Sequence, residues 1–108
     1  MRLMTAVGNM KTISTADIQH KLAQQERSFH LIDVRELDEY EAGRLPGALF
    51  MPWHIIEEKI KGIKPDTELI LYCRTGVRGK KAAEILENLG FTNITLYKDG
   101  WEGWEKVL

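Results

Sequence analysis

LILYCRTGVRGKKAAEILENLG, residues 69–90, is the stretch of sequence that decides the fold. Its first four residues form a continuous apolar run, which is typical of a strand covered on both faces of a sheet. Residues 78–89 then carry apolar side chains at helical spacing, and Gly90 is placed to end a helix there. We therefore expect a central strand, a tight loop that begins at Cys73, and a helix in direct succession.

Shorter apolar runs alternate with helical segments on both sides of this stretch. We expect strands at residues 31–34, 48–51 and 94–97. We expect helices over residues 15 to about 25, 35–41 and 54–61, and a last helical turn that carries Trp101 and Trp104. This alternation predicts crossover connections, and hence an α/β fold with a mostly parallel sheet of about five strands flanked by helices on both faces.

The composition limits the class of protein. The 108 residues are 44% hydrophobic and 29% charged, which fits one globular domain. We divide the chain into a leader over residues 1–10, whose lack of pattern is compatible with disorder, and a domain over residues 11–108.

The formal net charge of −1 gives no general attraction to nucleic acid or to an anionic membrane. A single cysteine and the lack of a long apolar run favour a cytoplasmic protein.

The loop CRTGVR, residues 73–78, is the candidate site. It lies at the carboxyl end of a parallel strand, where ligands gather in such sheets, and at a helix N-terminus, whose amides attract an anion. Gly76 suits a tight turn there, because glycine adopts positive φ without strain. Most free cysteines act as small buried hydrophobic residues. The arginines and lysines in and after this loop instead favour a reactive thiolate at Cys73. The side chains expected to stabilise it are Arg74, Arg78, Lys80 and Lys81.

The motifs of the chain resemble, in their order, those of the rhodanese-like domain family. They are LIDVR at 31–35, GRLPGA at 43–48, CRTGVR at 73–78 and DGW at 99–101. The resemblance covers residues 11–108 and implies a small α/β sandwich that acts as a sulfurtransferase. Cys73 would take a sulfane sulfur from thiosulfate or a persulfide donor, hold it as a persulfide, and pass it to a thiol or to cyanide. The resemblance implies no metal and no organic cofactor.

The resemblance also implies roles for single residues. Cys73 would be the nucleophile and Arg78 the side chain that binds the anion, while Asp33 and Arg35 would brace the loop. Three departures from the family pattern leave the substrate preference open: Arg44 stands where histidine is frequent, Asp99 where glycine is frequent, and Gly79 where serine is common. The expected substrate cradle consists of Arg74, Thr75, Gly76, Val77 and Arg78.

Other functions remain open at this point. A non-catalytic persulfide carrier or a regulatory protein-binding module would need the same loop. Phosphatases and arsenate reductases are less favoured, because their loops place five residues between cysteine and arginine, where this loop has four. The expected partners are a small anionic sulfur donor and a thiol acceptor, and the acceptor thiol can belong to a protein. We expect neither nucleic acid nor a membrane as a partner. The oligomeric state stays open.

The histidines His20, His30 and His54 lack metal-ligand spacing, although His54 follows a predicted strand end and is a candidate pocket residue.

Overall fold

Five parallel strands form one sheet in the computed structural model, which describes residues 10–108. The order across the sheet is β1-β5-β4-β2-β3, and every pairing is parallel. This confirms the predicted α/β class. The predicted leader, apart from Met10, lies outside the described residues. The strands are β1 (Lys11–Thr12), β2 (Phe29–Asp33), β3 (Leu49–Phe50), β4 (Glu68–Tyr72) and β5 (Ile94–Leu96).

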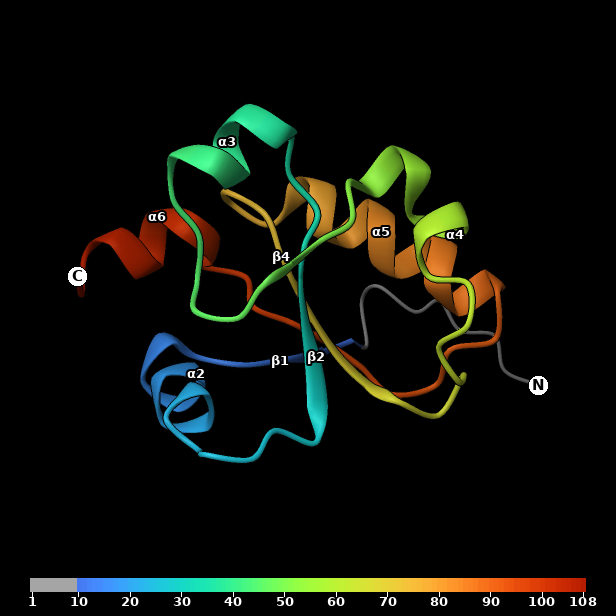
Figure 1. The fold of residues 1–108 in the computed structure, drawn as a ribbon, viewed down its shortest axis with the longest axis horizontal. Helices are drawn as coiled ribbons and strands as arrows, with labels where there is room; N and C mark the ends of the chain where they lie inside the picture. Colours follow the sequence, from blue (N-terminus) through green and yellow to red (C-terminus); the bar gives the residue numbers. More distant parts are fainter. Residues whose placement is uncertain (1–9) are drawn as a thin grey trace.

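Helices cover both faces of the sheet, as Figure 1 shows, with α2 and α6 on one side and α4 and α5 on the other. The first helix is shorter than predicted, because Leu22 is its last buried residue and residues 23–26 are exposed. The helix predicted at 54–61 begins as a 3-10 turn, η1 (Trp53–Ile55). The helices are α2 (Thr15–Leu22), α3 (Leu37–Ala42), α4 (Ile56–Lys59), α5 (Val77–Asn88) and α6 (Gly100–Glu105).

The central strand β4 joins two separate hydrophobic clusters. Leu69 and Leu71 face α4 and α5, whereas Ile70 and Tyr72 face α2 and α6. This follows from the alternation of side chains along a strand. All four residues are fully buried. Because β4 is fixed from both faces, the loop that follows it starts from a rigid position.

No helix within residues 10–108 combines the length and the apolar character that crossing a bilayer requires.

Candidate active site

The Cys73 thiol lies in a cradle of backbone amides at the start of α5. The residue directly follows β4 and is 1% exposed. Its Sγ accepts hydrogen bonds from the N–H of Gly76 at 3.0 Å and from the N–H of Gly79 at 3.3 Å. Gly76 has a φ of 102°, so the loop uses the conformational freedom that the sequence indicated. These amides belong to a helix N-terminus and therefore favour negative charge on the sulfur.

Gly79 contributes more than the sequence analysis assigned to it. A Cβ at this position would lie 2.6 Å from Leu96 Cδ1, so the first turn of α5 packs directly on β5. That close approach brings the Gly79 amide to Cys73 Sγ. A serine at this position would need this contact to open.

Helix α6 holds the outer side of the loop. The N–H of Trp101 donates to the Cys73 carbonyl at 2.8 Å, and the N–H of Glu102 donates to the Arg74 carbonyl at 3.3 Å. Gly100, with a φ of 60°, makes this approach possible, because a side chain at this position would clash with the Cys73 carbonyl oxygen. The loop carbonyls are therefore bound to α6. The DGW motif at residues 99–101, to which the sequence alone assigned no contact, supplies this support.

Asp33 and Arg35 form a buried ion pair beside the loop. Arg35 Nη2 lies 2.7 Å from Asp33 Oδ2, and Arg35 Nε donates to both carboxylate oxygens at 3.0 and 3.1 Å. Arg35 Nη2 also donates to the Gly43 carbonyl at 2.6 Å, and the Tyr72 hydroxyl donates to Asp33 Oδ2 at 2.7 Å. The Tyr72 oxygen in turn accepts the N–H of Leu45 at 3.1 Å. The network thus links the end of β2 to the residue directly before Cys73.

The charge states in this network follow from burial and from Asp33. Burial, and then the charge of Asp33, raise the pKa of Tyr72 far above its ordinary value, so its phenol stays a hydrogen-bond donor. Burial alone would lower the pKa of Arg35, but the hydrogen bonds and charge of Asp33 outweigh it and raise the pKa. The network therefore holds a permanent cation, its carboxylate and a neutral phenol.

Both arginines of the loop are paired with carboxylates that lie far away in the sequence. Arg78 Nη1 lies 2.6 Å from Glu39 Oε1, and its Nη2 lies 3.0 Å from Oε2, in a half-buried bidentate pair. Arg74 Nε lies 3.2 Å from Glu102 Oε2 in an exposed pair. The sequence predicts that both side chains stabilise negative charge on the sulfur and its donor, but in the structure a carboxylate pairs with each of them.

Glu39 is held in place from its own helix as well. Its Oε1 accepts the N–H of Glu36, the N-cap residue of α3, at 2.9 Å. The hydrogen bonds to Arg78 lower the pKa of Glu39 from 4.5 to about 2, against the opposing effect of burial and with help from the Glu36 amide. The same pair raises the pKa of Arg78. The Glu39–Arg78 pair is therefore fully charged at neutral pH.

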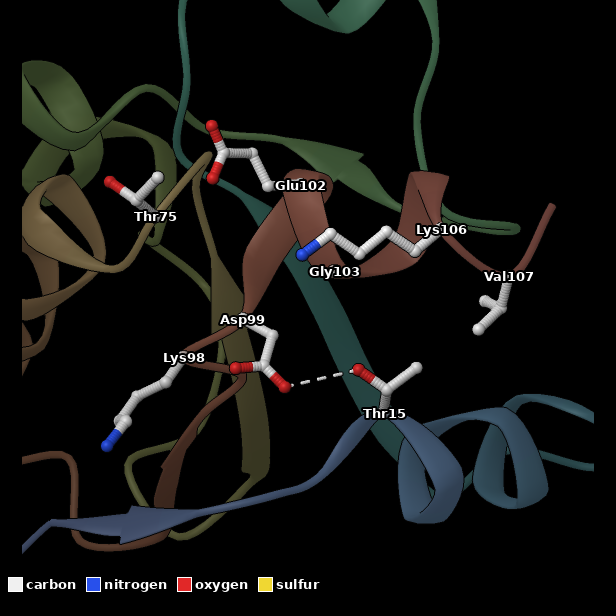
Figure 2. Close-up of a pocket in the computed structure, with 8 residues that line it drawn as sticks. All are labelled: Thr15, Thr75, Lys98, Asp99, Glu102, Gly103, Lys106 and Val107. Carbon is white, nitrogen blue, oxygen red and sulfur yellow. Dashed lines mark hydrogen bonds between the residues drawn. The ribbon is translucent and has the colours of Figure 1, made fainter.

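The remaining candidate residues lie around the rim. Val77 is 63% exposed, and Thr75 is exposed and lines a groove of about 490 Å³ beside α6 (Figure 2). Glu102, the partner of Arg74, and Lys106 also line this groove, where Thr15 donates to Asp99 Oδ2 at 3.3 Å. The groove carries charges of both signs. Cys73 does not line it.

Three other side chains singled out in the sequence have local partners. The Arg44 guanidinium lies over the Tyr40 ring, 4.3 Å from its centroid, and donates to the Tyr40 carbonyl at 3.1 Å. Lys81 Nζ lies 4.8 Å from the Trp53 ring centroid. His54 is about half exposed, and its Nδ1 lies 3.8 Å from Glu36 Oε2. In the part of the chain that the structure describes, no three His, Cys, Asp or Glu side chains are grouped to hold a metal ion.

The chain is similar to known proteins over nearly its whole length. The family model described as "Rhodanese-like domain" matches residues 15–107. A protein named thiosulfate:glutathione sulfurtransferase from Saccharomyces cerevisiae is 29% identical over an alignment of 111 positions, gaps included, which covers 91% of this chain and 80% of that protein. A protein named sulfurtransferase from Allochromatium vinosum is 29% identical over 94 residues, with 87% of each chain covered.

A solved structure has the same fold. The human single-domain sulfurtransferase TSTD1 superposes with a TM-score of 0.80 at 27% identity, and the match covers 91% of this chain and 97% of that one. The fold, the order of the motifs and the family match agree over the same residues. The chain belongs to the rhodanese-like domain family.

Proposed function

We propose that this protein is a sulfurtransferase that moves sulfane sulfur from thiosulfate or a persulfide donor to a thiol or cyanide acceptor through a persulfide on Cys73. The observation that carries the proposal is the pair of hydrogen bonds from the Gly76 and Gly79 amides to Cys73 Sγ, at 3.0 and 3.3 Å. A thiolate is both the nucleophile in the first half of the reaction and the leaving group in the second. Amides that stabilise it therefore serve both halves.

The reaction divides into two displacements at sulfur. The Cys73 thiolate attacks the outer sulfur of thiosulfate, a new S–S bond forms, and the S–S bond of the donor breaks. Sulfite leaves with the electron pair, and Cys73 carries a persulfide. An acceptor thiolate or cyanide then attacks the terminal sulfur, and the Cys73 thiolate leaves. No net oxidation or reduction of the protein occurs over the cycle.

Supporting residues of the site have positioning roles in this proposal. Asp33 and Arg35 fix the end of β2 and, through Tyr72, the last residue of β4. Gly100 and the α6 amides fix the outer side of the loop. Arg74, Thr75, Gly76, Val77 and Arg78 form the wall of the cradle.

The length of the loop favours sulfur chemistry over phosphate chemistry. The loops of cysteine phosphatases place five residues between cysteine and arginine, one more than the four between Cys73 and Arg78. Here the Gly76 amide reaches the sulfur itself at 3.0 Å. The shorter loop therefore supports the proposed sulfur transfer over phosphate chemistry.

The test is the production of thiocyanate from thiosulfate and cyanide by the wild type and by Cys73→Ser. We expect turnover in the wild type and none in the variant, with circular dichroism and urea unfolding as controls for folding. One equivalent of sulfur loaded without repeated turnover would instead identify a persulfide carrier. If thiosulfate and persulfide donors give neither turnover nor loading, the proposal is wrong, and a phosphatase assay becomes the next step.

A further inference from the structure

We propose that Glu39 determines which sulfur donors the site accepts: by holding Arg78, it removes one positive charge from the anion site and favours low-charge persulfide donors over dianionic thiosulfate. This inference rests on the proposed function and deepens it by naming the substrate class. Glu39 contacts Arg78 and not the sulfur, so it is a positioning and specificity residue.

The Glu39–Arg78 ion pair is held by several hydrogen bonds. The two terminal nitrogens of Arg78 bind the two oxygens of Glu39, at 2.6 and 3.0 Å. Bidentate, charge-assisted pairs of this kind are the strong ones among ion pairs. The Glu36 amide holds the same carboxylate at 2.9 Å, so Glu39 cannot turn away without losing this capping hydrogen bond of α3 as well. Both side chains are about one quarter exposed, which limits screening by water.

The second loop arginine provides a contrast within the same site. Arg74 meets Glu102 through one nitrogen at 3.2 Å, and the two side chains are 61% and 47% exposed. Exposed pairs with a single contact contribute about 0–1 kcal/mol, so Arg74 separates from Glu102 readily. The charge at Arg78, in contrast, is neutralised for as long as Glu39 is in place.

With Arg78 paired, the groups that hydrogen-bond to the sulfur are the amides of Gly76 and Gly79. These amides and the N-terminus of α5 carry partial positive charges, which favour a thiolate or a singly charged persulfide. Thiosulfate brings two negative charges to the same place. The binding free energy of a dianion exceeds that of a monoanion by an amount that grows with the net positive charge of the site. Neutralisation of Arg78 therefore reduces the advantage of thiosulfate over a singly charged persulfide.

Both donors load Cys73 by the same balanced step. With thiosulfate, the thiolate forms a bond to the outer sulfur and sulfite leaves with the electron pair. With a persulfide anion, the thiolate forms a bond to the terminal sulfur and the donor thiolate leaves with the electron pair. The total charge on the reactants is −3 in the first case and −2 in the second, and the products carry the same totals.

The experiment measures the second-order rate of Cys73 persulfide formation with thiosulfate and with the persulfide of 2-mercaptoethanol. Glu39→Gln keeps the shape of the side chain and removes its charge. We expect it to raise the rate with thiosulfate about tenfold and the rate with the singly charged persulfide only about threefold, since the electrostatic free energy scales with donor charge. A merely structural role of Glu39 would not change the ratio of the two rates.

Two further variants isolate the cause. Asp38→Asn removes the same charge from the neighbouring residue of α3, which is exposed, and should change either rate less than about twofold, because water and salt screen it. The double variant Glu39→Gln/Arg78→Gln has no net charge at this pair, as in the wild type, and should restore the wild-type ratio. Equal changes with both donors in Glu39→Gln, or an equal effect of Asp38→Asn, would overturn the inference.

A binding measurement separates this inference from the proposed function. In the Cys73→Ser background, calorimetry reports thiosulfate binding without any sulfur transfer. We expect Glu39→Gln to tighten thiosulfate binding about tenfold in that background. If the wild type loads no sulfur from either donor, the proposed function fails, and unchanged thiosulfate affinity would reject the role of Glu39 as well.

Discussion

The Tyr72 hydroxyl donates a 2.7 Å hydrogen bond to the Asp33 carboxylate, and both residues are fully buried. The same oxygen accepts the N–H of Leu45 at 3.1 Å. Replacement of Tyr72 by phenylalanine leaves the Leu45 amide without a hydrogen-bond partner and removes one hydrogen-bond donor from the Asp33 carboxylate. We predict a loss of about 1–3 kcal/mol in the free energy of unfolding, which is the cost of unpaired buried polar groups.

Urea unfolding of Tyr72→Phe measures this loss. The matched control is Tyr97→Phe, whose hydroxyl meets Thr15 Oγ1 at 2.7 Å in a part-buried position. We expect the control to lose at most about 1 kcal/mol, because water can replace the lost partner there. An equal loss in both variants would mean that the Asp33 network adds nothing beyond an ordinary hydrogen bond.

The contact between Gly100 and the loop predicts a selective loss of activity. A Cβ at Gly100 would lie 2.4 Å from the Cys73 carbonyl oxygen and 2.5 Å from that of Arg74, so Gly100→Ala must displace the loop. Gly62→Ala is the control, because Gly62 also has a positive φ but has nothing within 4 Å of its Cβ position. Backbone strain of about 1–2 kcal/mol is common to both variants.

We therefore expect Gly100→Ala to lose most of its Cys73 loading rate, and Gly62→Ala to keep it. Loading is measured by intact mass at a temperature where both variants are folded. If Gly100→Ala loads sulfur as fast as Gly62→Ala, the support of the loop by α6 is not needed for the reaction.

The Glu39–Arg78 pair predicts a dependence of stability on pH. Arg78 lowers the pKa of Glu39 from 4.5 to about 2 in the folded state. A lowered folded-state pKa means that the stabilisation is complete above pH 4.5 and is lost as the pH falls towards 2. The shift corresponds to about 2 kcal/mol after allowance for partial exposure.

Unfolding of the wild type and of Glu39→Gln in urea at pH 7 and pH 3 tests this. We expect the wild type to exceed the variant by about 2 kcal/mol at pH 7 and by clearly less at pH 3. Asp38→Asn, with the same change in charge, should differ from the wild type by less than about 0.5 kcal/mol at pH 7. A gap between wild type and Glu39→Gln that stays constant with pH would contradict the charge pairing.

Lys80 and Lys81 predict a dependence of donor capture on salt. Both are exposed on α5 near the loop, and their field attracts an anionic donor over a distance. Loading by thiosulfate should slow as ionic strength rises, and Lys80→Gln should weaken that dependence. Lys64→Gln is the control, because Lys64 precedes β4 and lies at the opposite end of the sheet from the loop. A rate independent of salt in the wild type would rule out this steering.

The sequence predicted the parts of the fold that depend on local pattern. The apolar runs of β2, β4 and β5, and the helical spacing of α5, are properties of short segments, and the structure confirms them. The edge strand β1 is not predicted by the sequence. Lys11 and Thr12 are exposed and have no apolar pattern, so this strand depends only on its pairing with β5, more than eighty residues away.

The same reason limits what the sequence says of the site. The cradle around Cys73 is local, since Gly76 and Gly79 lie within the same loop and helix turn, and its amides were expected there. The partners of Arg74 and Arg78 are not local. Glu39 lies 39 residues from Arg78, and it meets that side chain only because the starts of α3 and α5 come together in the folded chain. Local sequence indicated a cationic loop, whereas the tertiary structure pairs both loop arginines with carboxylates.

The most direct test of the account is the intact mass of the protein after incubation with a sulfur donor and removal of small molecules. We predict that the wild type gains about one sulfur mass, that the added sulfur maps to the peptide containing Cys73, and that cyanide removes it as thiocyanate. Cys73→Ser should gain nothing. A wild type that gains no sulfur from thiosulfate or a persulfide, while its fold is intact, would contradict the central claim that Cys73 carries sulfur.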